Sequence, residues 1–194
     1  MNVLVAYATR HGATQGIAER IAQTLERHGL QVALRAADQA GAVEPYDAFV
    51  IGSAAYMGAW LEPATHFVEQ HRELLASRPV WLFSSGPVGS ELTDAKGRDV
   101  VEASVPREFA RFATEIQPRD ERVFYGAYDP DAKPVGMMER MGSFFTRMPG
   151  IHEALPAGDF RDWPAIESWA EAIAGELTGR ELAASNPSPI ARAT

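Results

Sequence analysis

The sequence has 194 residues, of which 46% are apolar and 23% charged, and this composition indicates a globular domain large enough to bury a substantial core. The net charge of −8 argues against non-specific nucleic-acid binding, because no general basic field attracts phosphate backbones. The absence of cysteine excludes disulfides, thiolate nucleophiles and cysteine-ligated metal centres. A strand-like N-terminus without a basic leader, and the lack of any run of about 18 apolar residues, predict a cytoplasmic protein that does not span a membrane.

The N-terminal stretch predicts a buried strand that leads directly into a helix. Val3–Ala6 is a continuous apolar run, and the apolar residues of 17–25 repeat at helical spacing. The connection carries Thr9 and Thr14, with Gly12 between them. Unpaired backbone N–H groups and the helix dipole favour an anion at such a junction. Neither GxxxxGKS/T nor GxGxxG is present, which disfavours an NTPase loop and a dinucleotide-binding loop. The junction therefore predicts a phosphate site, with an ordinary turn capped by Thr14 as the alternative.

The rest of the chain alternates between strand and helix patterns. The expected strands are 31–35, 48–51, 79–83 and 123–127, and the expected helices are 14–28, 63–75, 106–116 and 163–177. We expect 88–104 to be a loop, 179–194 to be a disordered tail, and residues 1–178 to form one domain with an insertion at about 129–150. Five strands alternating with helices indicate an α/β sandwich, with a parallel sheet of order 2-1-3-4-5 and helices on both faces.

Three connections leave the carboxyl ends of the predicted strands, namely Thr9–Thr14, Ser53–Trp60 and Ser84–Gly89. Ligands of such sheets bind at the edge where the strand order reverses. With the order 2-1-3-4-5, all three connections meet at this switch point. The sequence therefore predicts one pocket built from three separate stretches.

These connections resemble those of the flavodoxin superfamily, over essentially all of residues 1–178. Thr9-Arg10-His11-Gly12-Ala13-Thr14 is similar to the family loop that holds the phosphate of FMN, although His11 replaces a common hydroxyl residue and Arg10 adds a cation. The other two connections are similar to the loops that flank the isoalloxazine ring. The resemblance implies a flavodoxin-like three-layer sandwich with FMN as its cofactor.

Within the superfamily, the sequence is most similar to the menaquinone-dependent protoporphyrinogen oxidase group. The similar residues are Thr9, Arg10, Gly12, Thr14, Val50-Ile51-Gly52-Ser53, Tyr56, Gly58, Phe67-Val68, Gly126-Ala127-Tyr128 and Asp162-Trp163. This similarity implies an FMN-dependent oxidoreductase that acts on a quinone or a porphyrinogen. The alternative is a non-enzymatic flavodoxin that carries electrons between redox partner proteins, which the acidic net charge suits.

The candidate cofactor-binding residues are Thr9, Arg10, His11, Gly12, Ala13, Thr14, Ser53, Ala54, Ala55, Tyr56, Met57, Gly58, Trp60, Ser84, Ser85, Gly86, Pro87 and Gly89. Hydroxyls and backbone amides of the first connection would hold the phosphate, with Arg10 and His11 either on the phosphate or facing solvent. Tyr56 is the first choice for stacking on the ring and Trp60 the second, a core position being the alternative for both. Ser84, Ser85 and the Gly86 amide would bond the pyrimidine edge. No general base is evident, and no histidines have metal-ligand spacing.

Residues 134–148 hold four of the six methionines, and 133–148 carry three basic residues and one acidic residue. Met137, Met141 and Phe144 share one helical face. One interpretation is a helix packed on the domain or on a second copy in a homodimer. The other is an adaptable surface for a quinone, a porphyrinogen or peripheral contact with a membrane.

Overall fold

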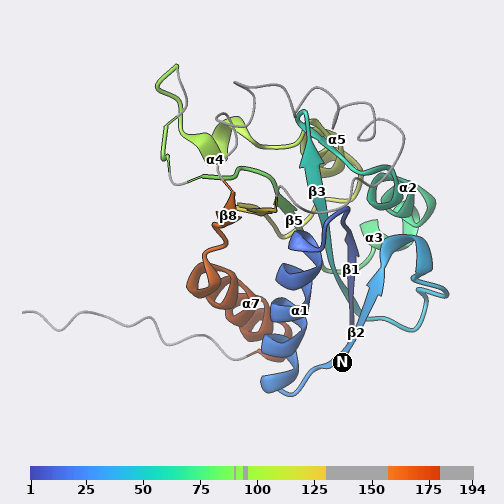
Figure 1. Ribbon diagram of the computed structural model, residues 1–194. Helices are drawn as coiled ribbons and strands as arrows, with labels where there is room; N and C mark the ends of the chain where they lie inside the picture. The colour runs from blue at the N-terminus through green and yellow to red at the C-terminus, as the bar shows by residue number, and fades with distance from the viewer. Residues whose placement is uncertain (90, 94–95, 130–156, 180–194) are drawn as a thin grey trace, which may run out of the picture.

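The computed structural model describes residues 1–89, 91–93, 96–129 and 157–179. Five parallel strands form the central sheet in the order β2-β1-β3-β5-β6 (Figure 1). They are β1 (Asn2–Ala8), β2 (Gln31–Ala36), β3 (Ala48–Tyr56), β5 (Val80–Ser85) and β6 (Asp120–Phe124). The short β4 (Ala59–Trp60) pairs only with the end of β3, so the predicted order 2-1-3-4-5 of the long strands is confirmed.

Helices cover both faces of the sheet (Figure 1). On one face lie α1 (Ala13–Arg27) and α7 (Trp163–Thr178), and on the other lie α2 (Glu62–Gln70), α3 (Arg72–Ala76) and α5 (Arg107–Glu115). Alternate β1 side chains divide between the two cores. Val3 and Val5 pack toward α1 and α7, whereas Leu4 and Ala6 pack toward the other face. The continuous apolar run of β1 is thus explained by burial on both faces.

Two strands extend further than the sequence predicts. β3 continues from Ile51 to Tyr56 and β5 continues to Ser85, with Ser53 paired to Ser84 and Ala54 to Ser85. These residues are small and lack the apolar pattern of a strand, but their backbones continue the ladders. The first residues of two predicted connections, 53–56 and 84–85, are therefore strand and not loop.

Other predicted boundaries also need correction. The helix expected at 63–75 is interrupted at His71, whose φ of −107° and ψ of 17° separate α2 from α3. The fifth long strand is β6, which ends at Phe124, and residues 127–128 instead form β7 (Ala127–Tyr128), which pairs with β8 (Gly158–Asp159). The predicted loop at 88–104 contains the short α4 (Val100–Ala103). A 3-10 turn, η1 (Ala37–Gln39), follows β2.

The start of α7 agrees with the sequence. The Asp162 carboxylate accepts a hydrogen bond from the Ala165 N–H at 3.0 Å and caps the helix. The methionine-rich segment 134–148 and residues 180–194 of the predicted tail lie outside the described residues. Within the described ranges, no helix has the length and apolar character needed to cross a membrane.

Candidate functional site

The three predicted stretches meet at the carboxyl ends of β1, β3 and β5. Ala8 is paired with Ser53, and Ser53 with Ser84, so the three strands end side by side. The Thr14 and Ser85 hydroxyl oxygens are 2.8 Å apart, which joins the first stretch to the third. The Arg10 guanidinium carbon is 4.5 Å from the centre of the Tyr56 ring, which joins the first stretch to the second.

The N-terminus of α1 is arranged as an anion-binding terminus. Its N-cap residue is Gly12, with a φ of 83°, a left-handed conformation that glycine adopts without strain. The Gly12 N–H donates to the Thr9 hydroxyl at 3.0 Å, which closes the loop. Within the described residues, no side chain caps α1, and its first turn contains no acidic residue. The first-turn N–H groups and the positive end of the dipole are therefore suited to an external anion.

Thr14 does not cap the helix, which corrects the alternative interpretation of this stretch. It lies inside α1, is fully buried and bonds to Ser85. Ser53 and Ser84 are also buried: the Ser84 hydroxyl donates to the Ser53 carbonyl at 3.4 Å, and the Ser53 hydroxyl accepts from the Leu61 N–H at 3.0 Å. In this structure the three hydroxyls form hydrogen bonds within the protein and are not presented at the surface.

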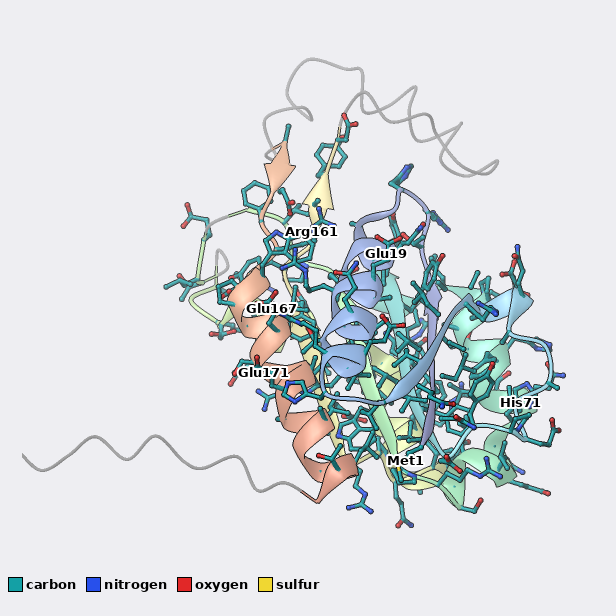
Figure 2. The ribbon with its side chains drawn as sticks, turned by 90° about the horizontal axis from the view of Figure 1, so that it is seen from below. Met1, Glu19, His71, Arg161, Glu167 and Glu171 are labelled. Carbon is teal, nitrogen blue, oxygen red and sulfur yellow. The ribbon has the colours of Figure 1, made fainter. Side chains whose placement is uncertain are left out.

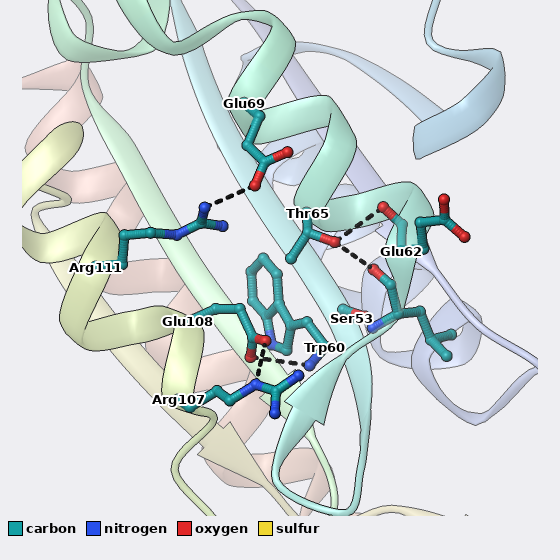
Figure 3. A network of polar contacts seen from close by, with 9 residues as sticks. Ser53, Trp60, Glu62, Thr65, Glu69, Arg107, Glu108 and Arg111 are labelled. Atoms are coloured by element: carbon teal, nitrogen blue, oxygen red, sulfur yellow. Dashed lines mark hydrogen bonds and ion pairs between the residues drawn. The ribbon is translucent and has the colours of Figure 1, made fainter.

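The second stretch is a β-hairpin made by β3 and β4. Its turn residues Met57 and Gly58 have φ values of 52° and 71°, the positive pair typical of a type I′ turn. The buried Glu108 carboxylate accepts a hydrogen bond from the Trp60 N–H at 3.0 Å and pairs with Arg107, as Figure 3 shows. α5 therefore holds the hairpin in place.

The two candidate aromatic residues of the hairpin lie in different environments. Tyr56 is 38% exposed and carries the Arg10 guanidinium on its ring. Trp60 is only 5% exposed and packs against Phe109 and Phe112, with ring centres 5.3 and 5.6 Å away. The core alternative is thus the one observed for Trp60, because α5 covers its ring, and Tyr56 remains the accessible aromatic.

The third stretch is held by the end of β6 and by the residues that follow it. The Gly86 N–H donates to the Phe124 carbonyl at 3.2 Å, and the Pro87 carbonyl accepts from the Gly126 N–H at 2.8 Å. The amide assigned to the pyrimidine edge is therefore already used within the fold. Gly86 lies close to the second stretch, since a side chain there would meet the Ala55 methyl group at 3.7 Å.

Sequence reasoning missed Arg161, which lies next to the first turn of α1. Its guanidinium donates to the Ala13 carbonyl at 3.2 Å and binds both carboxylate oxygens of Asp159 at 2.7 Å. The hydrogen bonds from Arg161 hold the pKa of Asp159 below its usual value. No local motif could have revealed this contact, because 148 residues separate Arg161 from Ala13.

Two surface hollows among the described residues lie away from this site. One, of about 500 Å³, follows the groove between β6 and α7, and the other lies between α1 and α7. None of the candidate cofactor-binding residues lines either hollow. Both belong to the side of the molecule that α7 covers.

Taken together, the sheet order and the α1 terminus define a doubly wound α/β protein with an anion-suited site at its switch point. A family model described as "Flavodoxin domain" matches residues 4–140, and the chain belongs to this family. Membership indicates FMN as the cofactor. The left-handed Gly12 and the first-turn N–H groups of α1 fit the phosphate of FMN. The exposed side chain of Tyr56 fits the planar flavin ring.

Solved structures share the fold at low identity. An archaeal flavodoxin is 16% identical, with a TM-score of 0.52 over 92% of this chain and 99% of that chain. A flavodoxin variant from Pseudomonas aeruginosa is 14% identical, with a TM-score of 0.53 over 92% and 100% of the two chains. Rubredoxin oxygen:oxidoreductase from Desulfovibrio gigas is 15% identical, with a TM-score of 0.53 over 92% of this chain and 36% of that one. A comparison with curated proteins found no match.

Proposed function

We propose that this flavodoxin-family protein is an FMN-dependent oxidoreductase that passes electrons to a quinone-type acceptor. The observation that supports it is the contact of the Arg10 guanidinium with the accessible Tyr56 ring, beside the anion-suited start of α1. A cation next to the ring site favours added negative charge on a bound cofactor, and therefore favours its reduction. FMN would supply the acceptance and release of electrons, so no general base is needed.

The residues of the chain would bind and orient the cofactor. The first-turn N–H groups of α1 and the Thr9 hydroxyl would donate to the phosphate. Tyr56 would flank the ring. The buried hydroxyls of Thr14 and Ser85 would keep the first and third stretches at a fixed separation.

The acceptor is proposed from the resemblance of the sequence to the menaquinone-dependent protoporphyrinogen oxidase group. Residues 134–148 are the proposed surface for a quinone or porphyrinogen, for a membrane or for a second copy of the chain. The second candidate function is a flavodoxin that carries electrons between proteins, and the net charge of −8 favours it. A cytoplasmic location stays a prediction.

Titration with FMN tests cofactor binding. We expect the protein, once freed of any bound flavin, to gain an absorbance band at about 450 nm and to bind one FMN. Gly12→Ala should weaken FMN binding at least about tenfold, because alanine disfavours the left-handed conformation of the loop. Gly29→Ala is the matched control: Gly29 has a φ of 86°, equally open surroundings and a place at the far end of α1. If both variants bind FMN alike, the loop is not the phosphate site.

Steady-state reduction of menadione with an artificial electron donor separates the two functions. An oxidoreductase should turn over menadione with saturation, and deletion of residues 134–148 should abolish this turnover while FMN stays bound. A carrier protein should instead show no saturable quinone turnover. Unchanged turnover in the deletion variant would remove residues 134–148 from the proposed acceptor surface.

A further inference from the structure

Arg161 is held in a fixed position between the start of α7 and the first turn of α1, as Figure 2 shows. Its guanidinium forms a bidentate ion pair with Asp159 and lies 4.4 Å from the centre of the Trp163 ring. Only 17% of the side chain is exposed. A guanidinium with this many contacts has little freedom to move away from α1.

Gly16 makes the close approach to α1 possible. A Cβ atom at this position would lie 2.5 Å from the Arg161 Nη1 atom, so any larger residue would displace the guanidinium. Glycine inside a helix costs about 0.5–1 kcal/mol relative to alanine. Gly16 therefore makes α1 less stable at the turn that contacts Arg161.

The position of this cation is electrostatically unusual. The start of a helix is its positive end, where cations are unfavourable and anions are stabilised. α1 has no acidic residue in its first turn, yet Arg161 contacts the first residue of the helix. Asp159 offsets part of the Arg161 charge. However, its carboxylate binds the Nε and Nη2 atoms, on the edge of the guanidinium that faces away from the Ala13 carbonyl, and it is 45% exposed. A dianionic group bound to residues 9–14 would turn this unfavourable arrangement into a favourable one.

We infer that Arg161 is a positioning residue that makes the site select the phosphorylated flavin over riboflavin. It acts through the Ala13 carbonyl and through its charge beside the first turn of α1, without contact with the reacting part of a flavin. This inference rests on the proposed function, since it concerns the same phosphate loop. The low exposure of the side chain means that salt screens its charge only weakly.

The test compares the affinities of the full-length protein for FMN and for riboflavin by quenching of flavin fluorescence. Arg161→Gln should weaken FMN binding by about threefold to thirtyfold and change riboflavin binding less than about twofold. Arg20→Gln is the matched control. Arg20 lies 4.8 Å from the same Trp163 ring and pairs with Glu167, but its position is about 10 Å further along α1. It should leave the ratio of the two affinities unchanged.

Two further variants keep the test independent of folding defects. Arg161→Lys should retain most of the preference for FMN, because the positive charge stays. Gly16→Ala should lower the preference although alanine favours the helix, because its Cβ atom displaces the guanidinium. Equal weakening of FMN and riboflavin in Arg161→Gln, or an unchanged ratio in both Arg161→Gln and Gly16→Ala, overturns the inference and leaves the proposed function intact. Failure of the unmodified protein to bind FMN overturns both.

Discussion

The hydrogen bond between Thr14 and Ser85 connects the first and third stretches of the site, and its contribution to stability can be measured. Both residues are buried, at 0% and 4% exposure, and their hydroxyl oxygens are 2.8 Å apart. Thr14→Val keeps the shape of the side chain but leaves the Ser85 hydroxyl without this partner. A buried polar group left unsatisfied costs about 1–3 kcal/mol. For a chain of this size, each kcal/mol corresponds to a decrease of about 2–4 °C in Tm.

A double-mutant cycle separates this bond from the effects of each substitution alone. Thr14→Val and Ser85→Ala should each lower the free energy of unfolding by about 1–3 kcal/mol, measured by urea denaturation. The double variant should lose about 1 kcal/mol less free energy of unfolding than the two single variants lose together, because it leaves no hydroxyl without a partner. Additive single effects would show that the two hydroxyls do not stabilise one another.

Thr24→Val provides the control for this cycle. Thr24 is on the same helix and is equally buried, but its hydroxyl donates to the Arg20 carbonyl and accepts from the exposed Arg27 guanidinium, both within α1. Its replacement should cost less than about 1 kcal/mol and leave FMN affinity unchanged, because valine leaves no buried hydroxyl unpaired there. Thr14→Val should in contrast weaken FMN binding, since it loosens the loop against the end of β5. Equal FMN affinities of the two variants would refute this link between the hydrogen bond and the site.

Three further substitutions test the packing and electrostatics of the fold by thermal denaturation. Gly52→Ala should lower Tm by about 6 °C or more, because its Cβ atom would overlap the buried Phe83 ring, and Phe83→Leu should restore part of the loss. Glu121→Gln should raise Tm by about 2–4 °C at pH 7 but not below pH 4.5. Burial and the Asp120 charge raise the pKa of Glu121, so the native state loses stability as the pH rises through this pKa and the carboxyl group ionises. An equal gain in Tm at both pH values would contradict this explanation. Asp162→Ala should lower the free energy of unfolding by about 1 kcal/mol, because it removes the cap of α7, while Asp162→Asn should lower it little. Equal losses in the two variants would contradict a stabilising role of this cap.

The strand order and the meeting of three stretches could be predicted because they follow from regular patterns. The apolar runs of β1 and β3 and the helical spacing of α1 and α7 are strong local patterns, and topology rules then place the strand ends together. The ends of β3 and β5 could not be predicted. Ala54, Ala55 and Ser85 have no side-chain pattern of a strand, and only pairing with a neighbouring strand extends the ladder there.

The missed features depend on contacts between distant residues. The start of β6 is polar, and its Asp120 carboxylate is satisfied by the Trp169 indole N–H at 2.8 Å and by Arg122. Although burial opposes it, these hydrogen bonds keep the pKa of Asp120 below its usual value. The break between α2 and α3 at His71 has neither glycine nor proline to mark it. Tertiary packing decides such positions and overrides local propensity.

The polar groups of the site divide into those used within the fold and those left for a ligand. The hydroxyls of Thr14 and Ser53, like the Gly86 amide, form hydrogen bonds inside the protein. The first-turn N–H groups of α1 are the main donors that the described fold does not use in this way. Because internal bonds already fix the three stretches, a phosphate bound to these donors would not have to order the loops first, and binding would lose less conformational entropy. The hydroxyls of Thr14 and Ser53 are buried and would not contact the ligand. They would support its binding indirectly, by preorganising the backbone that the phosphate would contact.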